Sequence, residues 1–201
     1  MVVSMPKLLA TLLLITLSQA SCNVESTSEG AAAAPKDKST TLITQAKAVH
    51  ASALTIDAHA DIEIPGKPSM YVGADGLSRV SPAKMHAGGL DAVVMSLAVG
   101  PMPRNPKGYA AAKALAQTKL AAVNALANDP VNNAIIVQTT EELQAAQTEG
   151  KAALILGFQN ALILGTNTTG IDELYDSGVR VFALTHMGHN NFADSSRTLF
   201  D

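Results

Sequence analysis

Residues 54–62 read Leu-Thr-Ile-Asp-Ala-His-Ala-Asp-Ile, a short apolar stretch that carries two aspartates and a histidine. A short β-branched stretch of this kind is typical of a buried strand. Three similar apolar runs follow it, at residues 90–99, 152–158 and 179–185. Near-continuous apolar strands that alternate with helices predict a parallel sheet covered on both faces, and therefore an α/β fold.

Segments with helical patterning separate these strands. Helices are predicted over residues 41–52, 109–128 and 170–177, and a short additional strand over residues 134–138. The first helix is expected to be amphipathic, with Leu42, Ala46 and Val49 on one face. A further helix opens near Thr140, which is the predicted N-cap because a threonine oxygen can accept from the first turn.

The composition excludes several classes of protein. The 201 residues are 47% hydrophobic and 15% charged, as in an ordinary globular protein, and the formal net charge of -3 argues against a nucleic-acid partner. A single cysteine excludes a disulfide framework and a four-cysteine zinc module. No Gly-x-Gly-x-x-Gly follows the first strand and no Walker-type Lys-Ser/Thr pair occurs, so a (β/α)₈ TIM barrel remains as the predicted architecture.

The amino-terminal residues predict export. In residues 1–17 one lysine precedes an apolar run of about ten residues, which is too short to span a bilayer. Two cleavages fit the small residues that follow: an ordinary site after Ala20, or a lipobox-like site before Cys22, despite Gln19 in place of the usual leucine. We expect a signal peptide over residues 1–21 with Cys22 lipidated, and plain secretion is the alternative. Either reading places the protein outside the cytoplasm, in a bacterial periplasm or anchored to a membrane by lipid alone.

A compositional change separates this leader from the fold. Residues 22–40 hold few large apolar side chains, and such a segment is predicted to be a flexible linker. The folded part is then residues 41–201. Because a complete (β/α)₈ barrel takes about 250 residues, we expect this chain to hold only about the first half of one.

Two candidate metal ligands end the first strand. His59 and Asp61 are two residues apart, so their side chains share a face of the strand. An imidazole beside a carboxylate can bind Zn²⁺ or a similar ion, although a hydrogen-bonded core pair is an equally good reading of this spacing alone. Gln159 and His186 follow the third and fourth main strands, at the edge where a barrel carries its chemistry.

These motifs together resemble the membrane dipeptidase (renal dipeptidase) family. The resemblance extends from about Leu54 onward through Ile56-Asp57-Ala58-His59-Ala60-Asp61, Gly88-Gly89-Leu90-Asp91-Ala92, Gly157-Phe158-Gln159-Asn160, Leu184-Thr185-His186 and Ala193-Asp194-Ser195. Members are (β/α)₈ metallohydrolases with two zinc ions that cleave dipeptides and sometimes related amides. The resemblance therefore implies a zinc-dependent dipeptidase acting through a metal-activated water, and it is compatible with a homodimer of the complete enzyme.

Carried over residue by residue, the resemblance makes His59 and Asp61 ligands of one zinc and His186 a substrate-binding residue. Gln159 stands where the mammalian-type members have a glutamate that bridges the two metals, and a neutral amide is a poor bridging ligand. Either the second metal is held weakly, or the bridging role lies elsewhere. The family's other histidine ligands and its proton shuttle lie on later strands, so no catalytic residue is assigned within this chain.

Three alternatives to a truncated dipeptidase stay open. We expect the 201 residues to be an incomplete, inactive portion of the enzyme, while a half-barrel that pairs with another chain would explain the same length. A non-catalytic exported barrel lipoprotein that binds peptides or a related ligand is favoured by Gln159. An amidohydrolase or a deoxyribonuclease of the same architecture is disfavoured. Those enzymes typically begin with His-x-His, whereas this chain has Asp61 in place of the second histidine.

Overall fold

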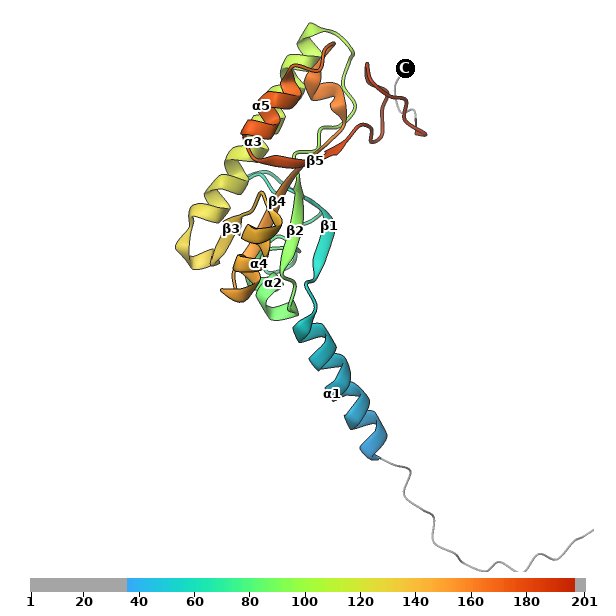
Figure 1. The fold of residues 1–201 in the computed structure, drawn as a ribbon. Coiled ribbons are helices and arrows are strands. Elements are labelled where there is room, and N and C mark those ends of the chain that lie inside the picture. The colour runs from blue at the N-terminus through green and yellow to red at the C-terminus, as the bar shows by residue number, and fades with distance from the viewer. Residues whose placement is uncertain (1–35, 198–201) are drawn as a thin grey trace, which may run out of the picture.

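Five parallel strands form one sheet in residues 36–197, the part of the chain that the computed structural model describes (Figure 1). They are β1 (Ile56–Asp61), β2 (Ala92–Ser96), β3 (Ala134–Ile136), β4 (Ala152–Gln159) and β5 (Val179–Ala183). Strand order is β1-β2-β4-β3, and β5 also pairs with β4. The predicted α/β fold with a parallel sheet is therefore confirmed.

One edge of β4 is shared by two strands. β3 pairs with the amino-terminal half of β4, from Ala152 to Leu154, and β5 pairs with its carboxyl-terminal half, from Leu156 to Gln159. The other edge of β4 pairs with β2 along most of its length. β1, β2, β4 and β5 are therefore successive strands of the main sheet, and β3 is a short addition beside the start of β4.

Helices cover both faces of the sheet. The helices of the described residues are α1 (Lys36–Ser52), which does not cover the sheet, α2 (Pro82–Gly88), α3 (Pro106–Asn128), α4 (Thr140–Thr148) and α5 (Gly170–Asp176), with 3₁₀ turns η1 (Pro130–Asn132) and η2 (Ala161–Leu164). Residues of α2, α3 and α5 pack into the larger core, whereas α4 packs into a smaller one with Ala92 and Ala153. The connection from β3 to β4 runs across the sheet in the opposite direction to the others, so a right-handed crossover places α4 on the other face.

The larger core is centred on β4 and α3. Leu154, Leu156 and Phe158 alternate along β4 and are almost completely buried. They share this core with Ala112 and Ala116 of α3, which are also buried, and these small side chains let the helix lie close to η2 and β3. The alanine-rich composition of the predicted helix over residues 109–128 is thus explained by close packing, and the structure adds its first turn from Pro106.

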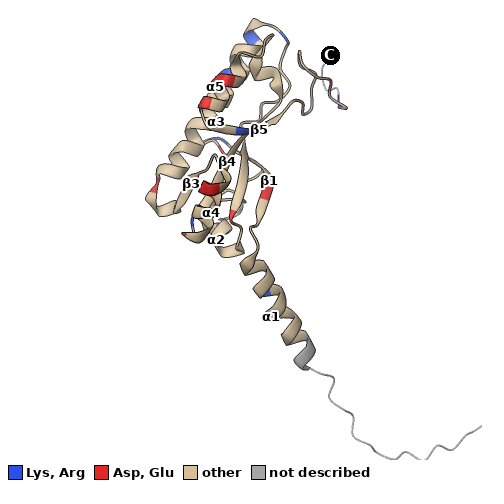
Figure 2. Cartoon of the chain, in the orientation of Figure 1, with Lys and Arg blue, Asp and Glu red and all other residues tan. Residues whose placement is uncertain are grey.

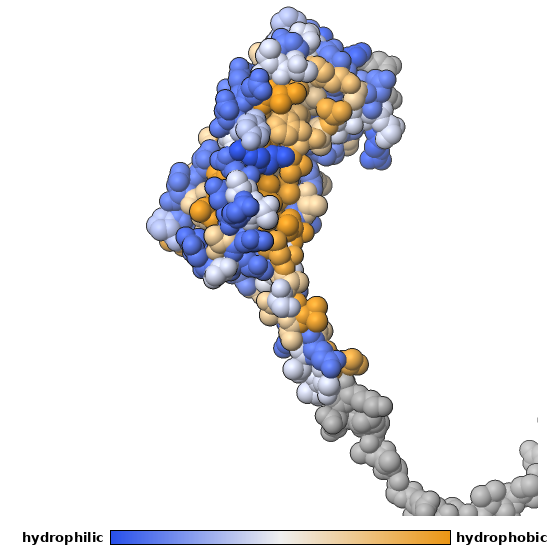
Figure 3. Space-filling view, viewed as in Figure 1, coloured by the Kyte–Doolittle hydropathy of each residue, from blue (hydrophilic) through white to orange (hydrophobic). Residues whose placement is uncertain are grey.

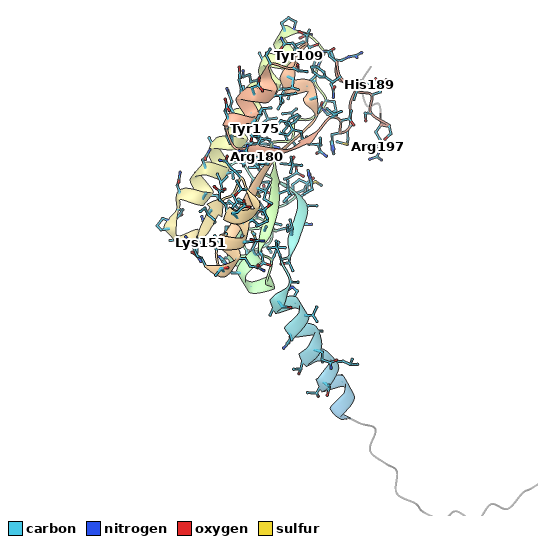
Figure 4. All side chains as sticks on the ribbon, viewed as in Figure 1. Tyr109, Lys151, Tyr175, Arg180, His189 and Arg197 are labelled. Atoms are coloured by element: carbon cyan, nitrogen blue, oxygen red, sulfur yellow. The ribbon has the colours of Figure 1, made fainter. Side chains whose placement is uncertain are left out.

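β3 and β5 share one edge of β4, and we call this arrangement the fork beside β4. At this fork, β5 also contacts α5. The guanidinium of Arg180 lies 3.9 Å from the ring centroid of Tyr175 (Figure 4) and donates from Nη1 to the Tyr175 carbonyl at 2.8 Å. It also donates from Nη2 to Oε1 of Gln138, just beyond β3. One side chain therefore connects both strands that share the edge of β4.

The amino-terminal helix differs from its prediction. No glycine or proline interrupts the sequence from Lys36 to Ser52, and α1 accordingly includes residues 36–40, which belong to the predicted linker. Leu42 and Val49 are 65% and 67% exposed, so the expected apolar face does not pack on the described residues, and α1 extends away from the sheet (Figures 1 and 3). The predicted signal peptide, Cys22 and the rest of the linker lie outside the described residues.

Three local predictions are also corrected. β1 is an edge strand and not a buried one within residues 36–197, with Ile56 46% exposed. The N-cap of α4 is Thr139, because its Oγ1 accepts from the Glu142 N–H and the Glu142 carboxylate accepts from the Thr139 N–H. Helix α2 is not predicted from the sequence, since its seven residues begin at Pro82 and end at Gly88, with Gly89 directly after them. Within the described residues, no helix is long and apolar enough to cross a membrane.

Candidate functional site

A bulge in β1 sets the direction of the candidate metal ligands. β1 contains one extra residue between Asp57 and Ala60 relative to β2. Ala60 is buried in the core beneath α3, so its neighbours His59 and Asp61 face the opposite side of the sheet. Regular alternation would have placed Asp57 on that side too. Instead, Oδ1 of Asp57 accepts from the His59 N–H at 3.0 Å, which stabilises the bulge.

The same face carries polar residues from the neighbouring strands. Asp61 pairs in register with Ser96 of β2, and Ser96 pairs with Gly157 of β4. Gln159 is two residues further along β4 and therefore faces the same side. Asp61 and Gln159 are half-buried and His59 is exposed. The structure thus places the predicted donors of β1 and β4 on one face, at the carboxyl edge of a parallel sheet.

Two further side chains interact with Asp61, and no motif or spacing in the sequence indicates either of them. The charge of Asp61 and a hydrogen bond to it raise the pKa of Tyr71, in the loop after β1. Burial lowers the pKa of Lys119 on α3, and the charges of Asp61 and Glu63 oppose that change. The Lys119 ammonium donates to the Ala98 carbonyl at 2.7 Å. Asp61 therefore interacts with a phenol through a hydrogen bond and with an ammonium through charge, on a strand that carries acidic residues (Figure 2).

The loop after β5 contains His186 but does not bring it into a ligand cluster. The His186 side chain is exposed, and its carbonyl accepts from Oγ of Ser195 at 2.5 Å. Further along, Nδ1 of His189 lies 3.0 Å from Oδ1 of Asp194 and 3.2 Å from the Ser195 nitrogen (Figure 4). These contacts fold the loop on itself, so that the predicted substrate-binding His186 projects from an ordered turn.

Asn160 is a structural residue at the strand ends. It is fully buried and has a φ of 80°, in the left-handed region. Its Nδ2 donates to the Val99 carbonyl at 3.3 Å, and its Oδ1 accepts from the Leu162 N–H at 3.1 Å and from Nδ2 of Asn190 at 3.2 Å. Asn190 also donates to the Leu184 carbonyl at 2.6 Å. One amide pair therefore joins the loops after β2, β4 and β5.

Replacing Asn160 with alanine is expected to lower the free energy of unfolding by about 3 kcal/mol, because buried partners lose their bonds and alanine disfavours a positive φ. Asn160→Gly is the matched control, since glycine adopts that φ freely and should cost about 1 kcal/mol less. Urea unfolding followed by circular dichroism measures both. A loss below about 1 kcal/mol in each variant would show that the amide network does not hold the strand ends.

The residues present form a partial donor set for a metal. A catalytic zinc site in proteins commonly uses three side-chain ligands and a water. Within residues 36–197, no group of three or more histidine, cysteine, aspartate or glutamate side chains is arranged to hold a metal ion. His59 and Asp61 are suitable in kind, whereas the neutral amide of Gln159 is weak. The described residues thus fit two ligands of one ion, and no catalytic step is derived from them alone.

Comparison with known proteins identifies the family. The family model described as membrane dipeptidase, peptidase family M19, matches residues 43–200. The chain belongs to the membrane dipeptidase family. The resemblance drawn from the sequence motifs is thereby confirmed, and membership places the chain among dipeptidase-like metallohydrolases. A search of curated proteins found no significant match.

Solved structures of dipeptidases share this fold. The probable dipeptidase PvdM from Pseudomonas aeruginosa has a TM-score of 0.69 and 24% identity, covering 80% of this chain and 41% of that protein. The dipeptidase AC, of family M19, has a TM-score of 0.57 and 14% identity, covering 68% and 44%. A Rhodobacter sphaeroides metallopeptidase, solved with a phosphinate mimic of L-Ala-D-Ala, has a TM-score of 0.51 and 13% identity, covering 60% and 40%.

The chain therefore spans less than half the length of these structures. The similarity of these structures to this chain confirms the predicted α/β barrel fold, which is present here in part.

Proposed function

We propose that the protein is a zinc-dependent dipeptidase and that the described residues supply one part of its site. The observation that carries the proposal is the placement of His59 and Asp61 on one face, at the carboxyl edge of the sheet, in a chain of the membrane dipeptidase family. In this proposal the pair holds one zinc, Gln159 occupies the bridging position and His186 contacts the substrate. A zinc bound there would supply an activated water for attack on the peptide carbonyl.

The chain's own residues would position this donor pair. The hydrogen bond between Asp57 and the His59 N–H supports the backbone at the first ligand. Tyr71, hydrogen-bonded to Asp61, would act on the second ligand as the outer partners of metal-binding carboxylates commonly do. These contacts come from β1 and the loop after it, so this support of the two ligands is local to residues 57–71.

The substrate and cellular location are further parts of the proposal. A dipeptide substrate is supported by the related Rhodobacter sphaeroides metallopeptidase, which was solved with a mimic of L-Ala-D-Ala. Export by a signal peptide over residues 1–21, with lipid attached at Cys22, is supported by the sequence pattern. A homodimer of the complete enzyme is proposed from the family resemblance.

Zinc binding by the purified chain tests the donor pair. We expect the chain to bind zinc in equilibrium dialysis followed by elemental analysis, and expect His59→Ala and Asp61→Asn each to weaken binding by about tenfold or more, since each removes a ligand. His86→Ala is the matched control, because His86 is on α2, where its Nε2 lies 3.4 Å from the Asn132 carbonyl. Equal zinc affinity in all four proteins would contradict the site.

Hydrolysis by the same preparations tests the extent of the site. With zinc added, residues 1–201 are expected to show little or no turnover of L-Ala-L-Ala or L-Ala-D-Ala, because the described donors fit two ligands only. Turnover at ordinary enzymatic rates, lost in His59→Ala, would support the dipeptidase and contradict the proposal that this chain supplies only part of its site.

Gln159 favours a second candidate, a barrel that binds peptides without cleaving them. Its neutral amide, in the bridging position of the family, would weaken a second metal and with it the hydrolytic centre. Equilibrium dialysis with a labelled dipeptide distinguishes the two functions. If the full-length gene product binds the dipeptide saturably and the dipeptide is recovered intact, the binding role is favoured over the enzyme.

A further inference from the structure

A recess lies on the side of the sheet that carries α2 and α3, opposite the face that carries His59 and Asp61. It is formed by the segment after β1, the residues around the start of α2, and the carboxyl-terminal half of α3. Its volume is about 380 Å³, within the range of about 300–1,000 Å³ in which small-molecule sites fall. We call this recess the α2–α3 groove.

Two polar atoms in this groove have no hydrogen-bond partner. Among the described residues, Oε1 of Glu63 and Oγ of Ser81 are the buried side-chain atoms left without one, and both residues line the groove. Ser81 is only 8% exposed. Because buried polar atoms without partners cost free energy and are rare, two in one recess indicate a missing donor for the carboxylate and a missing polar partner for the hydroxyl.

Local structure does not use the Ser81 hydroxyl. Ser81 precedes α2, where a serine side chain ordinarily accepts from an N–H of the first turn. Here that side-chain bond is absent, and the Ser81 carbonyl instead accepts from the Lys84 and Met85 N–H groups at 2.9 and 3.0 Å. The hydroxyl is therefore free to contact an occupant of the groove.

The lining of the groove is acidic and apolar. Its charged residues are Glu63 and Asp129, and no lysine or arginine lines it. Lys119 interacts electrostatically with Glu63, but its ammonium donates to the Ala98 carbonyl and does not line the groove. Most other lining side chains are apolar, among them Leu77, Met95 and Leu126. A ligand that complements this lining has a cationic hydrogen-bond donor attached to an apolar group.

We propose that the α2–α3 groove binds a small primary amine with an apolar substituent. Its ammonium donates to the Glu63 carboxylate and the Ser81 hydroxyl, and its apolar part packs against Met95 and Leu126. Charge-assisted hydrogen bonds of this kind are the strong ones in recognition, and the apolar contacts add buried area. Glu63 is two residues after Asp61, but the groups proposed to hold the amine are not the proposed zinc ligands, and the inference does not depend on the dipeptidase proposal.

Titration with 2-phenylethylamine tests the site, using the full chain labelled with ¹³C at its methionine methyl groups. The amine is expected to shift the Met95 methyl signal saturably, whereas 3-phenylpropionate, with a similar apolar body and the opposite charge, is expected not to. Glu63→Gln should weaken the amine by about tenfold and Ser81→Ala by about threefold. Glu141→Gln, a carboxylate change on α4 outside the groove, should leave affinity unchanged.

Three outcomes would overturn the proposal. The first is the absence of a saturable Met95 shift, which would mean that the groove holds water only. The second is an equal shift with 3-phenylpropionate, and the third is an unchanged amine affinity in Glu63→Gln. Circular dichroism checks the fold of each variant, and if Glu63→Gln does not fold, an unchanged affinity in Ser81→Ala overturns the proposal in its place.

Discussion

Replacing Phe158 with alanine is expected to lower the free energy of unfolding by about 3–5 kcal/mol, the range for deletion of a buried aromatic ring. The ring is 2% exposed and lies edge-on to Phe182, with centroids 5.0 Å apart and an interplanar angle of 84°. β4 is hydrogen-bonded on both edges, so its backbone cannot move inward to fill the space. Urea denaturation followed by circular dichroism measures the loss.

Two control variants show how the loss of unfolding free energy in Phe158→Ala is to be interpreted. Phe182→Leu keeps much of the apolar volume but removes the ring pair, and should cost about 1 kcal/mol. Leu184→Ala removes a side chain that is 54% exposed, and should cost far less than Phe158→Ala. A loss below about 2 kcal/mol in Phe158→Ala would mean that the core around β4 rearranges to fill the space.

Among the glycines of residues 36–197, Gly108 is expected to be the most sensitive to replacement by alanine, with a loss of about 3 kcal/mol in the free energy of unfolding. Gly108 is in the first turn of α3, and its N–H donates to Oδ1 of the N-cap Asn105 at 3.0 Å. A Cβ there would lie 1.9 Å from the Pro103 carbonyl oxygen and 2.9 Å from its carbon. Because the clash is with backbone, the helix start or the loop before it must move.

Gly88→Ala is the matched control for this prediction. Gly88 is the last residue of α2, and a Cβ there meets no atom within 4 Å. The same substitution should therefore be neutral or stabilising by up to about 1 kcal/mol, because alanine has the higher helix propensity. Thermal unfolding of the two variants side by side gives the comparison, and equal melting temperatures would contradict the role given to the Pro103 contact.

The strands and the family could be predicted from sequence because their signals are local. The apolar runs of β2 and β4 are short and continuous, and the His59–Asp61 pair lies within one strand. Position in the sheet is not local, so the sequence does not show that β1 is an edge strand. Its bulge is likewise invisible in the residue pattern, because the extra residue is defined only by pairing with β2.

The surroundings of the site could be predicted only in part. Tyr71 and Lys119 interact with Asp61, but they are 10 and 58 residues away in the chain, and no spacing rule joins them. Asn160 directly follows the predicted strand and Gln159 in the sequence, so its position at the strand ends is foreseeable. Its structural role depends on Asn190, which contacts it only after the loop beyond β5 has folded.

The fork beside β4 has a consequence for local opening of the molecule. β3 and β5 pair with separate stretches of β4, so the loss of one pairing leaves the hydrogen bonds of the other intact. Amide hydrogens on the two stretches can therefore exchange with solvent as two groups, each with its own opening free energy. Arg180, which contacts Gln138 beyond β3 and Tyr175 before β5, is the connection that couples the two openings.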